Sequence, residues 1–417
     1  MNIYTQRRNK LIDLLPDNSV CYIFAGDKVM MTNDEAYPFF VDRNFFYLTG
    51  LKEEGAILKI LKINNRITET LFILPFSEYL AKWVGGRIEA STARKISGVE
   101  SVFETTDFDD DFAATYNLQR SVENFKIFTD LYRYEAIQDD KAAMKFVRDK
   151  LNKYPSLCFK DIFPLMKKLR LIKDEGEIAD IKKAIDITNE GIKKMMAAIC
   201  DGMNERVMEG IFNFNLTNYL SSNSFKSICA SGIRATILHY VDNKHKVKDG
   251  ELFLCDLGAT FNEYQADISR TFPVNGHFTA RQKEIYEVVL NAQKLVFEKA
   301  KPGETLRGLQ KIVLDYYEKE LPKHNLNLPV SEYYFHGVSH QLGLDTHDFS
   351  DRNDVVLEPG MIISNEPGLY IEKEAIGIRI EDDLLITEDG NVNLSSDIIK
   401  EVADIEAYMA KYNENVK

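Results

Sequence analysis

Acidic side chains close or interrupt apolar runs in the C-terminal half of the sequence. Asp256 ends the run LFLCD, Asp267 follows eleven positions later, and Glu366 comes directly after MIISN. In GIRIED the two-residue period of a strand places Arg379 and Glu381 on the face opposite the isoleucines. A buried carboxylate costs several kcal/mol unless it is paired or binds a metal. Any one of these acids also fits a solvated position on an edge strand, but four of them among such apolar runs favour a metal site.

Three of the seven histidines, His336, His340 and His347, lie close together in HGVSHQLGLDTHD. The first two have the spacing of a helical zinc-protease motif, but that motif needs Glu where this sequence has Gly337. Gly337 and Gly343 also disfavour a helix. One imidazole and four carboxylates form an oxygen-rich ligand set. Such a set suits hard or borderline ions such as Mn²⁺, whereas structural Zn²⁺ sites are built on Cys and His. Four acids can offset two ions, and two ions about 3.5–4 Å apart can share a hydroxide and polarise a carbonyl.

Two domains, at residues 1–165 and 170–410, would position these side chains. The first reads as mixed α/β, with a strand at 19–27 and a hairpin that turns at Asn64 and Asn65. A long amphipathic helix over 174–199 opens the second domain. Another helix is expected over 280–300 with Thr279 as its N-cap, and a third after Thr305. The β-type segments between and after these helices carry the acids.

Composition excludes several classes of protein. The chain has 417 residues, and 52 Lys and Arg against 65 Asp and Glu give a net charge of −13. This charge disfavours binding to nucleic acid or to anionic membrane surfaces. No apolar run reaches the roughly 18 residues of a membrane helix, and the N-terminus lacks a signal-peptide pattern. The five cysteines are scattered and odd in number, which disfavours a disulfide framework, so we expect a cytoplasmic protein.

The order of these motifs resembles a known family. An Asp, a second Asp eleven residues later, HGxxHxLGLDxHD, NEPG and GIRIEDD together resemble the metal signature of the pita-bread metallopeptidases. The match is closest to the Xaa-Pro aminopeptidases (aminopeptidase P) and their prolidase relatives. DEAYPFFVDRNFFYLTG and SGIRATILHY resemble further segments of that group, so the resemblance covers nearly the whole chain. It implies an α/β (α+β) fold class: an N-terminal mixed α/β domain and a C-terminal pita-bread catalytic domain.

The resemblance also implies a set of metal ligands. Two divalent metal ions are expected, Mn²⁺ first, with Co²⁺, Zn²⁺ and Fe²⁺ also tolerated by such ligands. Asp267 and Glu381 would bridge the ions, Asp256 would hold one of them, and His340 and Glu366 would hold the other. Glu366 would also act as general base towards the bridging water.

Other residues match positions around the ions. His336 and His347 match residues that bind substrate and stabilise the tetrahedral intermediate, and His239 matches a substrate-pocket histidine. Arg379 would orient Glu381 or the site around it.

In the N-terminal domain, Asp34 and Trp83 match positions that reach a neighbouring subunit's active site in some relatives, although Trp83 could instead anchor the small domain's core. Phe40 stands where relatives often carry Arg, so no binding role is assigned to it.

The implied activity is removal of the N-terminal residue from peptides with proline at the second position, by attack of a metal-bridging hydroxide. A prolidase, which cleaves Xaa-Pro dipeptides, shares the ligands and is the nearest alternative. A methionine aminopeptidase is disfavoured by the large N-terminal domain. A pita-bread binding module without metal, or a metal-free enzyme of the creatinase kind, is disfavoured because all five ligands are present. A homodimer is expected by default, with a tetramer as the alternative.

Overall fold

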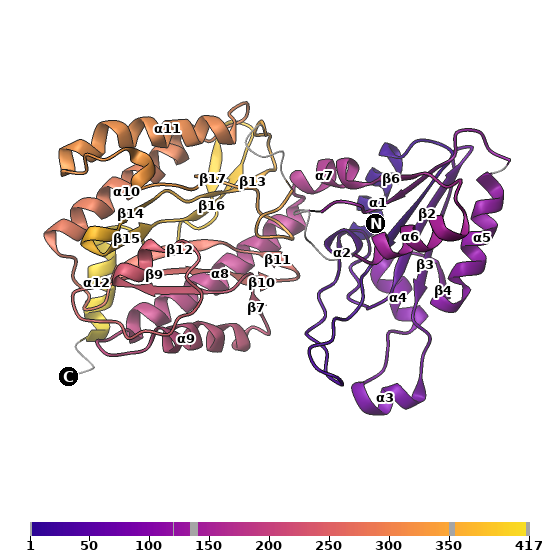
Figure 1. The fold of residues 1–417 in the computed structure, drawn as a ribbon, viewed down its shortest axis with the longest axis horizontal. Helices are drawn as coiled ribbons and strands as arrows, with labels where there is room; N and C mark the ends of the chain where they lie inside the picture. The colour runs from indigo at the N-terminus through magenta and orange to yellow at the C-terminus, as the bar shows by residue number, and fades with distance from the viewer. Residues whose placement is uncertain (1, 120, 134–140, 350–354, 414–417) are drawn as a thin grey trace. The chain divides into compact units, whose positions relative to one another are not determined.

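The structure is a computed structural model that describes residues 2–119, 121–133, 141–349 and 355–413. The chain folds into two compact units, Met1–Leu169 (unit 1) and Arg170–Lys417 (unit 2), shown in Figure 1. Each unit has its own sheets and helices.

Unit 1 is built on one mixed sheet with the strand order β4-β3-β2-β1-β5-β6. Its strands are β1 (Ser19–Phe24), β2 (Ile57–Ile63), β3 (Arg66–Ile73), β4 (Ser101–Glu104), β5 (Lys126–Thr129) and β6 (Phe159–Asp161). The predicted hairpin is confirmed: β2 and β3 are antiparallel, and both Asn64 and Asn65 have positive φ, at 48° and 60°. Asparagine tolerates this conformation, which a two-residue hairpin turn requires.

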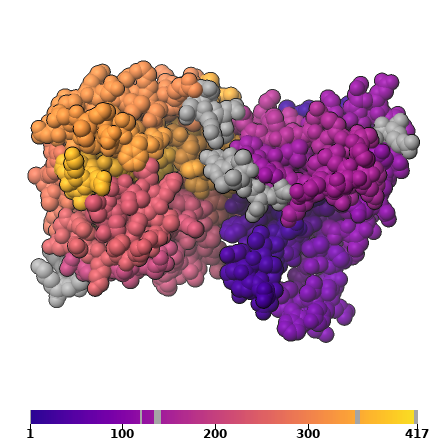
Figure 2. Space-filling view, in the orientation of Figure 1, coloured from indigo at the N-terminus to yellow at the C-terminus, as the bar shows by residue number. Residues whose placement is uncertain are grey.

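Helices cover the sheet of unit 1. They are α1 (Ile3–Leu14), α2 (Arg43–Thr49), α4 (Ala90–Ser97), α5 (Phe108–Gln119), α6 (Ala142–Lys153) and α7 (Phe163–Leu171), the last of which crosses the boundary between the units. Phe112 of α5 and Phe146 of α6 pack with Tyr22 and Phe72 of the sheet in a buried aromatic core. By contrast, α3 (Glu78–Val84) has no buried residue and projects from the rest of unit 1 (Figures 1 and 2).

The helices of unit 2 are α8 (Glu175–Ala198), α9 (Glu205–Asn218), α10 (Ala280–Lys299), α11 (Leu306–Glu320) and α12 (Val402–Asn413). Three of them, α8, α10 and α11, begin where the sequence predicts, and α9 and α12 were not predicted. Thr279 caps α10, and its side chain and that of Gln282 form a reciprocal capping box. Thr305 likewise caps α11. Among the described residues, no helix combines the length and apolar composition needed to cross a membrane.

Short antiparallel sheets fill the interior of unit 2. The strands are β7 (Ser222–Asn223), β8 (Ile228–Ser231), β9 (Leu252–Leu257), β10 (Ala259–Phe261), β11 (Tyr264–Gln265), β12 (Ile268–Pro273), β13 (Ile362–Asn365), β14 (Gly368–Ile371), β15 (Ile376–Arg379), β16 (Asp382–Ile386) and β17 (Asn391–Asn393). The centre of one sheet is β9, which pairs with β8 and β12, while β14 pairs with β15. This register sets Asp256 opposite Ser269 and Arg379 opposite Gly368. The predicted acids therefore lie on or directly beside paired strands.

Candidate metal centre

One cavity of about 300 Å³ in unit 2 gathers every site residue predicted from the second half of the sequence. These are Asp256, Asp267, His340, Glu366 and Glu381, together with His239, His336, His347 and Arg379. They come from segments separated by up to 142 positions in the chain, so folding rather than local sequence brings them together.

Strand ends place three of the carboxylates in the interior. Asp256 lies in β9, Asp267 directly precedes β12, and Glu381 lies between β15 and β16. Their exposed fractions are 8%, 5% and 2%. The alternative of solvated acids on an edge strand is therefore wrong for these three residues, and Glu366, just after β13, is only partly exposed.

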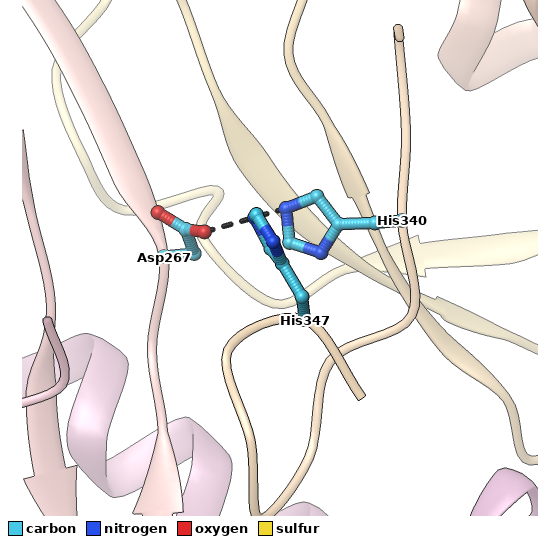
Figure 3. Close-up of side chains that lie close together, drawn as sticks. All are labelled: Asp267, His340 and His347. Atoms are coloured by element: carbon cyan, nitrogen blue, oxygen red, sulfur yellow. Dashed lines mark ion pairs between the residues drawn. The ribbon is translucent and has the colours of Figure 1, made fainter. Parts of the chain in front are cut away.

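The ligand atoms converge in overlapping groups. Among the described residues, Asp256, Asp267 and Glu381 each offer an oxygen within 4.8 Å of the others, as do the ligand atoms of His340, Glu366 and Glu381. Glu381 belongs to both groups. A third group joins Asp267, His340 and His347, which Figure 3 shows facing one another. His347, which was predicted to contact the substrate, therefore lies within reach of a metal ion bound beside Asp267 and His340.

The electrostatics of this cluster are those of a cation site. Burial raises the pKa of Asp267 well above its ordinary value, and the charges of Asp256, Asp383 and Glu366 raise it further. Burial, followed by the charge of Asp267, does the same to Glu381. Oδ1 of Asp256 is buried without a hydrogen-bond donor. Hydrogen-bond donors normally satisfy buried polar atoms, so mutually repelling carboxylates with an orphaned oxygen fit a divalent cation.

His340 has the tautomer of a metal ligand. Its Nδ1 lies 3.1 Å from the carbonyl oxygen of Gln341, which can only accept, so the proton is on Nδ1. The free Nε2 faces Asp267 Oδ2 at 3.4 Å, the contact drawn in Figure 3, and Glu366 Oε1 at 3.3 Å. The ring therefore presents its lone pair to the carboxylates, which is the arrangement that outer-shell hydrogen bonds impose on ligating histidines.

A buried hydrogen-bond chain connects Arg379 through Tyr370 to His336. Arg379 donates to Asp256 Oδ2 at 2.7 Å and to the hydroxyl of Tyr370 at 3.0 Å. Since the Tyr370 oxygen accepts from Arg379, its own proton goes to Nε2 of His336, 2.8 Å away. Burial and the charge of Arg379 lower the pKa of His336 to about 3, so its imidazole is neutral at neutral pH.

Arg379 reaches Glu381 through a serine. The guanidinium Nε donates to Ser269 Oγ at 2.7 Å, and that hydroxyl donates to Glu381 Oε2 at 2.9 Å. Sequence reasoning missed Ser269 and Tyr370. A signal for Tyr370 exists in GLYI, because the period of two puts Tyr370 and Gly368 on one face, and Gly368 pairs with Arg379.

Of the remaining predicted residues, His239 belongs to none of the ligand groups found among the described residues. His239 is exposed in the loop after η2 (Gly232–Thr236), next to Leu238 in the cavity lining. Asp34 and Trp83 belong to unit 1, whereas the cavity lining belongs to unit 2. Trp83 is 73% exposed on α3, so the alternative that it anchors the core of the small domain is wrong.

The chain is similar to known metallopeptidases. The family model of metallopeptidase family M24 matches residues 179–388, and that of the aminopeptidase P N-terminal domain matches residues 4–123. The Xaa-Pro aminopeptidase of Escherichia coli (strain K12) is 31% identical, with 97% of each chain covered. The corresponding protein of Haemophilus influenzae is 33% identical, over 97% of this chain and 96% of its own.

Solved structures show the same fold. A Bacillus anthracis protein classed provisionally as an aminopeptidase P superposes with a TM-score of 0.95 at 40% identity, over 99% of both chains. Aminopeptidase P from Escherichia coli with the inhibitor Pro-Leu gives a TM-score of 0.86 at 30% identity, over 99% of this chain and 98% of that one. These matches confirm the fold class, a mixed α/β N-terminal domain followed by a pita-bread domain. The chain belongs to the Xaa-Pro aminopeptidases of metallopeptidase family M24.

Proposed function

We propose that this enzyme is a dinuclear-metal aminopeptidase that releases the N-terminal residue from peptides with proline at the second position. The observation that carries the proposal is the convergence of buried carboxylates, one of which has an oxygen without a hydrogen-bond donor, beside histidines in one cavity. The relatives named for Xaa-Pro aminopeptidase activity, matched over nearly their whole length, support the substrate class.

Two divalent ions would be held by the two ligand groups that share Glu381. Asp256, Asp267 and Glu381 would hold one ion, and His340, Glu366 and Glu381 the other; Asp267, which also lies in a group with His340, would take part in both. Ions bound there would supply a hydroxide at neutral pH and polarise the scissile carbonyl. We propose Mn²⁺ as the native ion, because oxygen ligands dominate the set.

We propose that Glu366 accepts the proton of the attacking water. Burial raises its pKa above the ordinary glutamate value, despite the opposing charges of His340 and Arg379. A carboxylate of raised pKa accepts a proton more readily near neutral pH. Ser364 Oγ, 3.2 Å from Glu366 Oε1, also contacts the backbone N–H of His340 and so links the base to the ligand beside it.

The histidines face the space that the substrate would occupy. Tyr370 fixes the ring of His336, and His347 lies at the exposed rim of the cavity beside His340. We propose that His336 and His347 contact the scissile peptide and its developing oxyanion, and that His239 contacts the peptide further along. A proline amide has no N–H to pair with a strand, so side chains rather than backbone pairing would recognise it.

Peptide length separates this proposal from a prolidase. The test is hydrolysis of Xaa-Pro-Yaa tripeptides and Xaa-Pro dipeptides by chelator-stripped protein, with and without added Mn²⁺. We expect metal-dependent cleavage that favours the tripeptide. Preference for the dipeptide would identify a prolidase. Absence of cleavage with metal bound, matched by the Glu366→Gln control, would favour a binding module.

We also propose that the protein forms a homodimer, or a tetramer in which Asp34 or Trp83 approaches a neighbouring site. Exposed apolar side chains on two segments of unit 1 support self-association: Val29, Met30, Tyr37 and Phe40 on one, Tyr79 and Trp83 on α3. Monomeric proteins rarely expose large apolar patches. Light scattering on the wild type and on Trp83→Ser tests this, and a monomeric wild type would reject it.

We propose a cytoplasmic location for the enzyme. All five cysteines are free thiols, three of them buried, although Cys229 and Cys255 stand opposite each other on β8 and β9. A reducing compartment suits this arrangement. Fractionation of the native cell with an antibody against the protein tests the assignment.

A further inference from the structure

Glu205 is a buried carboxylate outside the metal centre. It is the first residue of α9 and has no exposed surface. Oε1 accepts from Ser231 N at 3.0 Å, Ser231 Oγ at 2.8 Å and Arg234 Nε at 2.9 Å. Oε2 accepts from Tyr240 OH at 2.8 Å and His245 N at 2.9 Å. Five donors on one carboxylate, shared between both oxygens, indicate an anchor rather than an incidental pair.

The donors lie on both sides of His239 in the sequence. Ser231 and Arg234 precede it, whereas Tyr240 and His245 follow it, so one carboxylate closes the loop that carries this histidine. The backbone adds a reciprocal bond, in which Glu205 N donates to the carbonyl of His245 at 2.8 Å. The entry and exit of the loop are therefore fixed at a single point.

A second contact fixes the loop against the strand that leads to the metal centre. The 3-10 turn η2 packs on β15, which ends at Arg379. A Cβ at Gly377 would lie only 2.1 Å from the carbonyl oxygen of Ala235, so the approach requires glycine. The loop is thus held between Glu205 and β15.

His239 itself has no such support. Its side chain is exposed in the cavity, and within the described ranges no hydrogen bond holds its ring. The position of the imidazole therefore depends on the backbone of its loop, which Glu205 closes.

We propose that Glu205 is a positioning residue that sets the place of His239 in the substrate cavity. The inference rests on the proposed function for the role of His239, but the anchoring itself can be measured without activity. Glutamine is the sharpest substitution. Both oxygens of Glu205 accept hydrogen bonds, and glutamine would replace one of them with an NH₂ group that faces other donors and cannot accept from them. Displacement of a substrate-binding group by about 1 Å can cost on the order of a hundredfold in rate.

A double-mutant cycle tests the coupling. In the wild-type background, Glu205→Gln should lower kcat/KM for an Xaa-Pro tripeptide by about tenfold or more, chiefly through KM, with bound metal unchanged. In the His239→Ala background the same change should cost less than about twofold, because the group being positioned is gone. An equal loss in both backgrounds would show that Glu205 is merely structural and would overturn the proposal.

Glu177→Gln is the matched control. Glu177 is likewise buried in the first turn of a helix, α8, and accepts from Asp174 N and Tyr264 OH. Its removal should destabilise the protein without coupling to His239, so any effect on kcat/KM should be the same in both backgrounds. If Glu205→Gln does not fold, Tyr240→Phe replaces it in the cycle. Tyr240 directly follows His239, and this substitution removes one hydrogen bond to the Glu205 carboxylate.

Hydrogen exchange gives a reading that is independent of activity. Glu205→Gln should raise exchange of the amides of Ser231 and His245, whereas Glu177→Gln should leave them unchanged. Unchanged exchange in Glu205→Gln would overturn the anchoring even if the enzyme is active. An inactive wild type with the expected exchange would reject the proposed function and leave the anchoring intact.

Discussion

The carboxylates and the histidines of the cavity are held in different ways. Asp256, Asp267 and Glu381 are buried on or beside paired strands, so sheet register determines their separation. The histidines lie on irregular segments and are partly or fully exposed. Their positions depend on a few polar anchors, such as Tyr370 for His336. The sheets therefore position three of the five proposed metal ligands, whereas His340 and the histidines proposed to contact substrate depend on loops that can be altered separately.

The largest effect is expected from substitution of a buried carboxylate that the strands position. Glu381→Gln removes the residue shared by both ligand groups, so bound metal should fall and kcat/KM should drop by about 10⁴-fold. Metal analysis and steady-state kinetics measure this. Glu388→Gln makes the same chemical change at an exposed position and should leave both values unaltered. Full metal content in Glu381→Gln would contradict the ligand assignment.

A loop anchor should affect stability more than metal content. Arg170 Nη2 lies 2.8 Å from both Asp345 Oδ2 and Asp348 Oδ1, beside His347, and the arginine is buried. Arg170→Met leaves the buried Asp348 with Lys173, a more distant cationic partner at 3.8 Å, and should lower the free energy of unfolding by about 3 kcal/mol. Denaturant titration measures the loss.

The control for this change breaks an exposed ion pair. Lys182→Met removes the pair with Asp186, and exposed pairs contribute about 0.5 kcal/mol or less. If the two variants lose equal stability, the buried pair does not anchor the His347 loop.

Removal of a rim histidine should separate chemistry from metal binding. His347→Ala should lower kcat about a hundredfold and leave bound metal near the wild-type level, since Asp267 and His340 retain other partners. His340→Ala should lose metal as well. If both variants lose metal equally, His347 is a metal ligand. The difference between carboxylates held by strands and histidines held by loops would then be smaller than their burial suggests.

The pH dependence of stability should reveal the anchor of the His239 loop. Burial opposes ionisation of Glu205, but its hydrogen bonds from His245 N, Arg234, Ser231 and Tyr240 prevail and lower its pKa. A lowered pKa stabilises the fold above the unfolded-state value of about 4.3, and this contribution is lost as pH falls through the folded-state value. The stability advantage of wild type over Glu205→Gln, about 2 kcal/mol at pH 7, should therefore shrink below about pH 4. A difference that does not change with pH would contradict an ionised anchor.

The smallest effect is expected on the projecting helix of unit 1. Trp83 is highly exposed and α3 buries nothing, so Trp83→Ser should change the free energy of unfolding by less than about 0.5 kcal/mol. A larger loss measured by denaturant titration at low concentration would mean that the tryptophan packs within its own chain.

Local features of the fold were accessible from the sequence. Asn64-Asn65 between two β-type runs and Thr279 before an apolar helical pattern act through neighbouring residues, and both predictions are confirmed. The metal-ligand candidates could also be named, because acids in apolar runs are anomalous wherever they occur. Their number and their setting in apolar runs favoured a shared metal site, but which ligand would hold which ion was implied only by resemblance to a family.

Tertiary structure alone decided the environment of those residues. Ser269 donates to Glu381 across 112 positions, and Glu205 receives donors 26 to 40 positions away. No local pattern marks such partners, because burial and hydrogen bonding depend on which segments the fold brings together. The types and order of the chemical groups follow from the sequence. Only the packing of the strands determined which carboxylates repel one another, which oxygen stays unpaired, and which anchors hold the histidines.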